Sequence, residues 1–234
     1  MADLMLKITL LSDTTFGRGD GVAGLVDAEV QHDATGCPFV FGRTVKGMIR
    51  EECANLLFAL EGADTPHAER WQRVGQALLG APGSGEQQRA ALIVGDAALP
   101  EELRHAIGWQ VEHRQIQRHE VLDAFTAIRQ QTAVNPETGA PQDETLRAAR
   151  VILRGTVFWA PLHINEARLC AHQVKLAEAL MLLAALVSGW QRAGTGRNRG
   201  RGLIQAALIE RQATELVECT AAYLARFAKE MLPS

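Results

Sequence analysis

Apolar and polar positions recur along the chain in an order that predicts a small α+β domain. Residues 4–11 alternate as a strand does, because successive side chains of a strand point to opposite faces. Comparable apolar runs predict further strands at 90–99, 155–164 and 202–210. Apolar residues at helical spacing instead predict helices at 45–62 and 171–190.

The first of these helices has two distinct faces. Its apolar stripe consists of Val45, Met48, Ile49, Cys53, Leu56, Leu57 and Leu60. Arg43, Lys46 and Arg50 recur at steps of three and four on another face, and Thr44 can cap the helix. The helix at 171–190 is apolar nearly all round, which predicts that it is buried.

The element order is strand, helix, strand, strand, helix, strand. This order is typical of a ferredoxin-like or RRM-type split βαβ core, with a four-stranded antiparallel sheet and two helices on one face. Inserted pieces include an extended segment at 25–33, a polar helix at 68–79 and a final amphipathic helix at 213–231. We predict one domain over 1–234, with a thumb-like hairpin insertion at about 109–150 that turns at "NPETGAP".

Positive charge is concentrated in one short segment near the C-terminus. The chain has 24 lysines and arginines, a formal net charge of −3 and a pI of about 6.2, so any polyanion site must be a local cluster. Residues 193–205, "AGTGRNRGRGLIQ", combine four glycines with three arginines between a helix and a strand. That order excludes a P-loop, which links a strand to a helix. Two interpretations stay open: an anion site of loop amides and arginines, or a tight connection with solvated arginines.

Cysteine usage and hydropathy predict a reducing, cytoplasmic location without a membrane segment. Cys37, Cys53, Cys170 and Cys219 are widely spaced, which favours free thiols over a zinc ribbon. A zinc site that joins one of them to His105, His113 or His119 is the less favoured alternative. The longest apolar stretch carries Glu178 and is shorter than the ~20 residues that span a bilayer. The N-terminus lacks a signal-peptide layout.

Three motifs in order resemble the RAMP superfamily, whose members are RRM-like subunits of CRISPR–Cas effector complexes. They are "GLVDAEVQHDATGCPFVFGRTVKGMIR" at 24–50, "LLGAPGSGEQQRAALIVGDAAL" at 78–99 and the Gly/Arg stretch near the C-terminus. The resemblance is to the backbone subunit of type III complexes, which polymerises along a guide RNA. The matching residues are Gly24, Asp27, Asp33, Thr35, Gly36, Pro38, Gly42, Lys46, Gly47 and Arg50.

The resemblance implies that Asp27 is catalytic. Asp27 follows a glycine-rich loop and matches the position of the aspartate with which catalytic members cleave target RNA. A carboxylate there would act on the 2′-hydroxyl nucleophile of the RNA itself or hold a divalent cation, Mg²⁺ or Mn²⁺. We expect Asp33 to fix a turn instead. His32 is either a helper or an ordinary surface histidine.

The resemblance also implies an RNA-binding surface. Its residues would be Arg43, Thr44, Lys46, Arg50, Gly194, Gly196, Arg197, Arg199 and Arg201. Only 5% of the residues are aromatic, so we expect the protein to grip the RNA backbone while guide–target pairing supplies sequence specificity. On periodicity alone, Lys46 and Arg50 would form a solvated helix face. The implied partners are guide RNA, complementary target RNA, copies of this chain or related subunits, and no membrane.

Two other functions remain open. The chain could be a structural RAMP subunit that does not cut RNA. It could also be a guide-processing endoribonuclease, which needs a histidine base near a tyrosine or serine. The single tyrosine, Tyr223, falls in the last predicted helix, which weighs against that second alternative.

Overall fold

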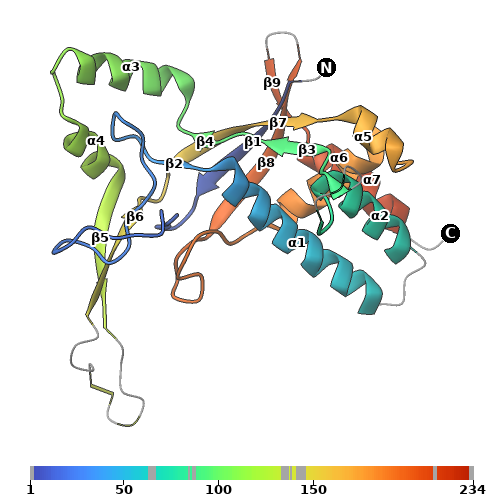
Figure 1. The fold of residues 1–234 in the computed structure, drawn as a ribbon, viewed down its shortest axis with the longest axis horizontal. Helices are drawn as coiled ribbons and strands as arrows, with labels where there is room; N and C mark the ends of the chain where they lie inside the picture. Colours follow the sequence, from blue (N-terminus) through green and yellow to red (C-terminus); the bar gives the residue numbers. More distant parts are fainter. Residues whose placement is uncertain are drawn as a thin grey trace.

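The computed structural model describes residues 3–62, 67–83, 85, 88–132, 137, 139–140, 146–212 and 215–231. An antiparallel sheet crosses the middle of the molecule, with helices gathered on one side and a narrow hairpin projecting from the other end (Figure 1). Within these residues the main sheet has seven strands: β1 (Asp3–Leu10), β2 (Phe39–Val40), β3 (Leu92–Val94), β4 (Ala97–Ala98), β7 (Val157–Ile164), β8 (Ile204–Gln212) and β9 (Glu215–Glu218).

The helices divide into a packed group and an outlying pair. The packed group is α1 (Gly42–Gly62), α2 (Ala68–Leu79), α5 (Glu166–Ala171), α6 (Leu176–Gly189) and α7 (Thr220–Met231). The outlying pair is α3 (Glu101–Glu112) and α4 (Arg118–Phe125), which precede the hairpin strands β5 (Thr126–Gln131) and β6 (Arg147–Ile152). The predicted α+β class with an antiparallel sheet is confirmed, and the ferredoxin-like assignment within that class stays a prediction.

Strand β1 lies at the centre of the sheet. It pairs antiparallel with β7 on one side and with β8 on the other, so that Lys7 faces both Trp159 and Ala207. Strands β3 and β4 extend the sheet beyond β7, and β9 extends it beyond β8. The beginning and the end of the chain therefore share one core, as the fold prediction required.

The alternation read in residues 4–11 separates the two faces of the sheet. Leu6 and Ile8 are buried, whereas Lys7 and Thr9, which alternate with them, are partly exposed. The buried face joins one hydrophobic cluster with α1, α2, α6 and α7, in which α6 is the most deeply enclosed helix. Burial of apolar area at roughly 25 cal/mol per Å² makes this cluster the main source of stability.

Several predicted boundaries are wrong. The strand predicted at 90–99 is interrupted between β3 and β4, where the Asp96 carboxylate turns away to accept a 2.7 Å hydrogen bond from Gly42 N. That bond satisfies a free N–H at the start of α1, where a negative charge also suits the helix dipole. Helix α1 thus begins at Gly42, and Thr44 lies inside its first turn and is not its cap. Thr44 N donates to Phe41 O at 2.8 Å.

Other predicted elements are shortened. The helix predicted at 171–190 begins only at Leu176, as α6, because α5 ends at Ala171 and the chain then turns through Gln173 at a φ of 56°. The last helix begins at Thr220, after β9, and not at 213. The segment 25–33 forms isolated bridges and no continuous strand.

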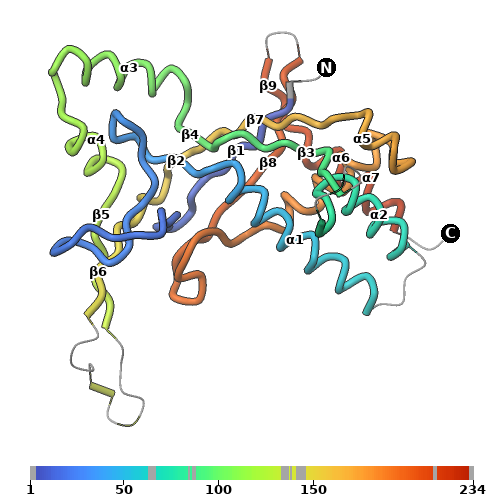
Figure 2. Tube along the Cα trace, in the orientation of Figure 1, coloured from blue at the N-terminus to red at the C-terminus, as the bar shows by residue number. Residues whose placement is uncertain are grey.

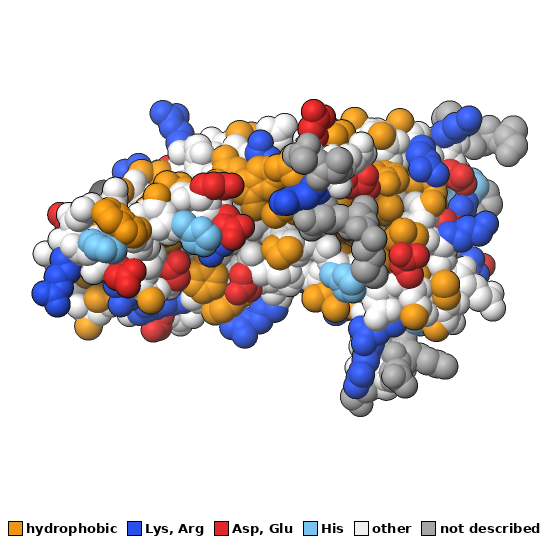
Figure 3. All heavy atoms as spheres, turned by 90° about the horizontal axis from the view of Figure 1, so that it is seen from above, with side chains coloured by type: hydrophobic (Ala, Val, Ile, Leu, Met, Phe, Trp, Pro, Cys, Tyr) orange, Lys and Arg blue, Asp and Glu red, His pale blue; other side chains and the backbone are white. Residues whose placement is uncertain are grey.

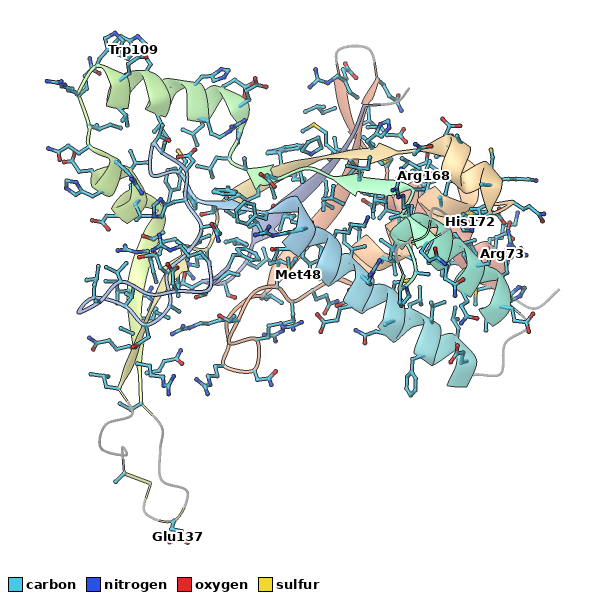
Figure 4. The ribbon with its side chains drawn as sticks, viewed as in Figure 1. Met48, Arg73, Trp109, Glu137, Arg168 and His172 are labelled. Carbon is cyan, nitrogen blue, oxygen red and sulfur yellow. The ribbon has the colours of Figure 1, made fainter. Side chains whose placement is uncertain are left out.

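The insertion predicted at about 109–150 is helical in its first part. The hairpin proper runs from the pair Thr126↔Ile152 to the pair Gln131↔Arg147. Most of "NPETGAP" lies outside the described residues; of those that are described, Glu137 lies at the far end of the projection (Figure 4). Over the described chain, no helix is long and apolar enough to cross a bilayer.

Gly47→Ala should raise the free energy of unfolding of the RNA-free protein by about 1 kcal/mol, since glycine costs that much inside a helix. A Cβ at Gly47 meets open space. Gly42→Ala is the matched control in the same helix, because its Cβ would lie 2.1 Å from Val94 O and stability should fall. Urea unfolding measures both variants, and a destabilised Gly47→Ala protein would contradict the prediction.

Candidate functional site

The Gly/Arg loop, defined here as residues 193–202, is a closed structure. Ala193 N donates to Gly202 O at 2.8 Å, and Thr195 N donates to Thr15 O at 3.0 Å. Gly194 and Gly202 have φ values of 74° and 75°, and a Cβ on either would lie within 2.5 Å of a backbone oxygen. Only glycine fits both conditions, so these residues hold the loop shut against the sheet.

The three arginines of the loop reach in different directions. Arg197 lies 3.1 Å from both carboxylate oxygens of Glu51 on α1, and Arg199 donates to Gln131 Oε1 of the hairpin at 2.8 Å. Burial, Arg129 and Arg199 lower the pKa of Arg201, against the opposing effect of Asp13. Figure 2 shows the loop below β8, between the hairpin and α1. The sequence-predicted Gly196 also belongs to it, at a φ of 75°.

The predicted cations of α1 have partners that the sequence did not indicate. Lys46 Nζ donates to Leu92 O at 2.7 Å, and Arg50 donates to Leu79 O at the end of α2. Burial lowers the pKa of Lys46, with smaller contributions from nearby arginines. The interpretation of Lys46 and Arg50 as a merely solvated face is therefore wrong, since both side chains also hold neighbouring elements in place.

Arg43 and Thr44 are exposed at the start of α1. The Arg43 guanidinium lies 4.4 Å from the centre of the Phe41 ring. A depression beside the start of α1 is lined by Arg43 and Lys46 together with two arginines that sequence reasoning missed, Arg89 and Arg168. Arg168 comes from α5 (Figure 4), about 120 residues from α1 along the chain, and no spacing pattern could have connected them.

Asp27 lies against strand β6 of the hairpin. Its backbone N–H donates to Ala148 O, and its Oδ2 accepts from Ala148 N, both at 2.7 Å. The side chain is exposed, and this is its carboxylate's one hydrogen bond within the described part of the chain. The structure therefore presents a charged carboxylate that is anchored through one oxygen.

The two neighbouring candidates have other roles. Asp33 Oδ1 accepts hydrogen bonds from Thr35 N, Thr35 Oγ1 and Cys37 N at 2.7 to 3.0 Å, which confirms that Asp33 fixes the turn. His32 contacts its neighbour's carbonyl and, at 3.3 Å, Arg118 of α4. It is thus engaged with the outlying helices.

Metal-binding residues do not gather among the residues described: no three histidine, cysteine or acidic side chains there could share an ion. The four cysteines are free, and burial raises the pKa of Cys53 to about 11, which keeps that group a thiol. Asp27 offers a single carboxylate. That suits a cation such as Mg²⁺, which commonly takes one or two carboxylates from a protein and further oxygens from substrate phosphates.

Positive charge is local on this protein. Seen from above, cationic and anionic side chains are interspersed over the face in Figure 3. The Gly/Arg loop and the start of α1 instead bring arginines together with few carboxylates among the side chains that line them. These two places are the sites at which a polyanion would gain most from Coulomb attraction.

Fold and site together define an α+β domain with a projecting hairpin and a closed, arginine-bearing loop that contacts it. The chain belongs to the RAMP superfamily, whose family model matches residues 7–205.

Two solved structures share this fold at low sequence identity. One is a cryo-EM structure of the type III-B Cmr-beta bound to cognate target RNA, with a TM-score of 0.59, 11% identity and coverage of 89% of this chain and 97% of the other. The second is the apo state of the type III-B Cmr-beta, with a TM-score of 0.58, 12% identity and coverage of 93% and 99%. No curated protein matches the chain. The likeness extends over nearly the whole fold.

Proposed function

We propose that this protein is a guide-RNA-binding backbone subunit of a type III CRISPR interference complex and that it cleaves complementary target RNA. Membership of the RAMP superfamily supports this proposal, as does the fold it shares with type III-B Cmr-beta chains, one of them bound to cognate target RNA. Its partners would be guide RNA, target RNA and neighbouring subunits of the complex.

One observation carries the proposal further. Arg199 of the Gly/Arg loop contacts Gln131, and Asp27 contacts Ala148. In the hairpin Gln131 pairs with Arg147 and Gln130 pairs with Ala148, so the two contacts fall on adjacent rungs. A cationic loop and an exposed carboxylate therefore contact adjacent rungs of one hairpin, and a phosphodiester bound there would reach both.

The chemistry follows from these groups. The loop arginines would hold phosphates and stabilise the charge that develops on the one under attack. Asp27 would orient the adjacent 2′-hydroxyl and accept its proton, so that cleavage leaves a 2′,3′-cyclic phosphate and a 5′-hydroxyl. The hairpin would displace a nucleotide and open the sugar–phosphate to in-line attack. A divalent cation held by Asp27 and the RNA would add further charge neutralisation at that phosphate.

Guide processing is less well supported. The Tyr223 hydroxyl donates to Glu210 at 2.9 Å, and burial together with Glu210 raises the pKa of Tyr223 to about 12. Tyr223 lies on α7, on the helical side of the molecule. A tyrosine hydroxyl that is bonded to a carboxylate and has a raised pKa is a poor candidate for the catalytic group of a guide-processing enzyme.

Replacement of Arg197, Arg199 and Arg201 by glutamine should weaken RNA binding for all sequences alike. Three lost phosphate contacts should flatten the slope of log K against log salt by about 2, since each single-strand contact contributes roughly 0.7. The matched control removes three cations from α2 and α7, Arg73, Arg226 and Lys229, and should keep affinity and slope. The probe is the RNA that copurifies with the protein from its host, identified by sequencing. An unchanged slope in the loop variant would mean that the site is misplaced.

A further inference from the structure

The segment that carries Asp27 is hydrogen-bonded to three consecutive residues of β6. Asp27 exchanges hydrogen bonds with Ala148, Ala28 forms a parallel bridge with Ala149, and Arg150 N donates to Ala28 O at 2.9 Å. The segment thus lies along the outer edge of β6 through an isolated parallel bridge. It connects the candidate carboxylate to the strand that leads to the far end of the hairpin.

A buried ion pair lies at the end of this contact. Arg150 Nε is 3.0 Å from one Glu29 carboxylate oxygen and 3.2 Å from the other, and the two side chains are 7% and 3% exposed. Glu29 Oε1 also accepts from Val30 N at 2.9 Å, so the carboxylate is fixed on its own side as well. No other ion pair recorded in the described part of the chain has both side chains this deeply buried.

Arg150 connects this pair to the rest of the insertion. Its Nη1 donates to Thr126 Oγ1 on β5 and to Asp123 Oδ1 on α4, each at 3.0 Å, and its carbonyl accepts from Thr15 Oγ1 at 3.0 Å. One guanidinium therefore joins the Asp27 segment, both hairpin strands and α4. Well-packed apolar side chains of similar volume often replace such a buried pair without loss of stability, so stability alone gives little reason for it.

We propose that Glu29 and Arg150 are positioning residues. They hold Asp27 against the hairpin, so that the carboxylate acts on the same nucleotide that the hairpin displaces. This inference rests on the proposed cleavage by Asp27. If the hairpin selects the nucleotide that is displaced, the carboxylate must keep a fixed register with the hairpin strands, so that it takes the proton from the 2′-hydroxyl of that nucleotide as the hydroxyl attacks the adjacent phosphate. The pair sets where and how fast the RNA is cut, and not whether it is bound.

The test removes both charges together. Glu29→Met/Arg150→Met keeps the volume of the pair and avoids a lone buried charge, which would unfold the site. In the RNA-free protein, amide hydrogen exchange should accelerate at Asp27, Ala148 and Arg150. In the assembled complex the variant should bind the complementary RNA with unchanged affinity, cut it on the order of 100-fold more slowly and lose its single cut position. Glu29→Gln still offers an oxygen to Arg150, whose charge keeps its ion pair with Asp123, and should recover most of the rate.

The matched control is Arg70→Met/Glu178→Gln. That pair joins α2 to α6 at 2.8 Å, away from the hairpin, and its removal should change neither exchange at Asp27 nor cleavage. Unchanged exchange at Asp27 and Ala148 in the Glu29/Arg150 variant would overturn the anchoring role. Faster exchange with a normal cut position and rate would overturn the positioning role. Normal cutting by Asp27→Asn would refute the proposed function instead, a result that neither pair variant can produce.

Discussion

Asp27→Asn should lower the single-turnover rate of target cleavage at least about 100-fold, within the range that a positioned general base supplies. Asparagine is the informative replacement because it keeps an oxygen that can accept from Ala148 N, the one hydrogen bond that the carboxylate makes to the described chain. The segment should therefore stay on the hairpin while the negative charge is lost. Guide binding and target capture should be unchanged, since the side chain is exposed and buries no apolar area.

The control and the product ends make this result specific. Asp20→Asn removes an exposed carboxylate from the same loop, which pairs with Arg18, and should cut normally. The unmutated complex should leave 2′,3′-cyclic phosphate and 5′-hydroxyl ends, and chelation of divalent cations should suppress them. A normal rate for Asp27→Asn would make Asp27 a structural anchor and support the alternative of a RAMP subunit that binds RNA without cutting it.

The sequence was most informative where one short segment determines the outcome. The alternation at 4–11 correctly identified the buried face of β1 because strand periodicity is local. Asp33 could be assigned to a turn because its partners lie two and four residues away. The Gly/Arg loop was singled out for the same reason, since its glycines and arginines lie within ten residues of one another, but its role stayed open.

Contacts between distant segments could not be predicted in this way. Asp96 supplies the first helical N–H of α1 with an acceptor from 54 residues away, and that interaction both interrupts a predicted strand and moves the helix start. Lys46 and Arg50 lie at the spacing of a solvated face, yet their donors reach main-chain oxygens of β3 and α2. Glu29 and Arg150 show no local signal at all, because their pairing depends on how the insertion folds back.

Glycine and arginine have complementary roles in the loop. The glycines let its backbone close, and the closed backbone directs the arginine side chains toward different partners. Gly194 and Gly202 bring the two ends of the loop against Thr15 and Ala193, at distances that no Cβ permits. The closed loop then directs Arg197 toward α1 and Arg199 toward the hairpin. A net charge of −3 is compatible with RNA binding for this reason, since the backbone concentrates a few cations at one place.

Gly202→Ala should therefore destroy the loop, while Gly200→Ala should leave it nearly intact. Both residues have positive φ, 75° and 73°, so alanine carries the same backbone strain of roughly 1–2 kcal/mol at each. At Gly200 the new Cβ meets open space, whereas at Gly202 it would lie 2.1 Å from Ala193 O. Relief of that clash must break the hydrogen bonds from Ala193 N to Gly202 O and from Gly202 N to Asp13 O.

Stability and RNA affinity should fall together in Gly202→Ala, and both should be largely kept in Gly200→Ala. We expect Gly202→Ala to lose about 2–5 kcal/mol in urea unfolding, as strain and overpacking add, and to lose most of the salt-dependent RNA affinity with it. Gly200→Ala should lose only the strain and bind nearly normally. Because Gly202 carries no charge, a loss of affinity measured where the variant is folded must come from the displaced loop with its amides and arginines. If Gly202→Ala is destabilised but binds RNA as tightly as Gly200→Ala does, the loop is a structural connection and the phosphates are held elsewhere, with the arginines around the start of α1 as the next surface to test.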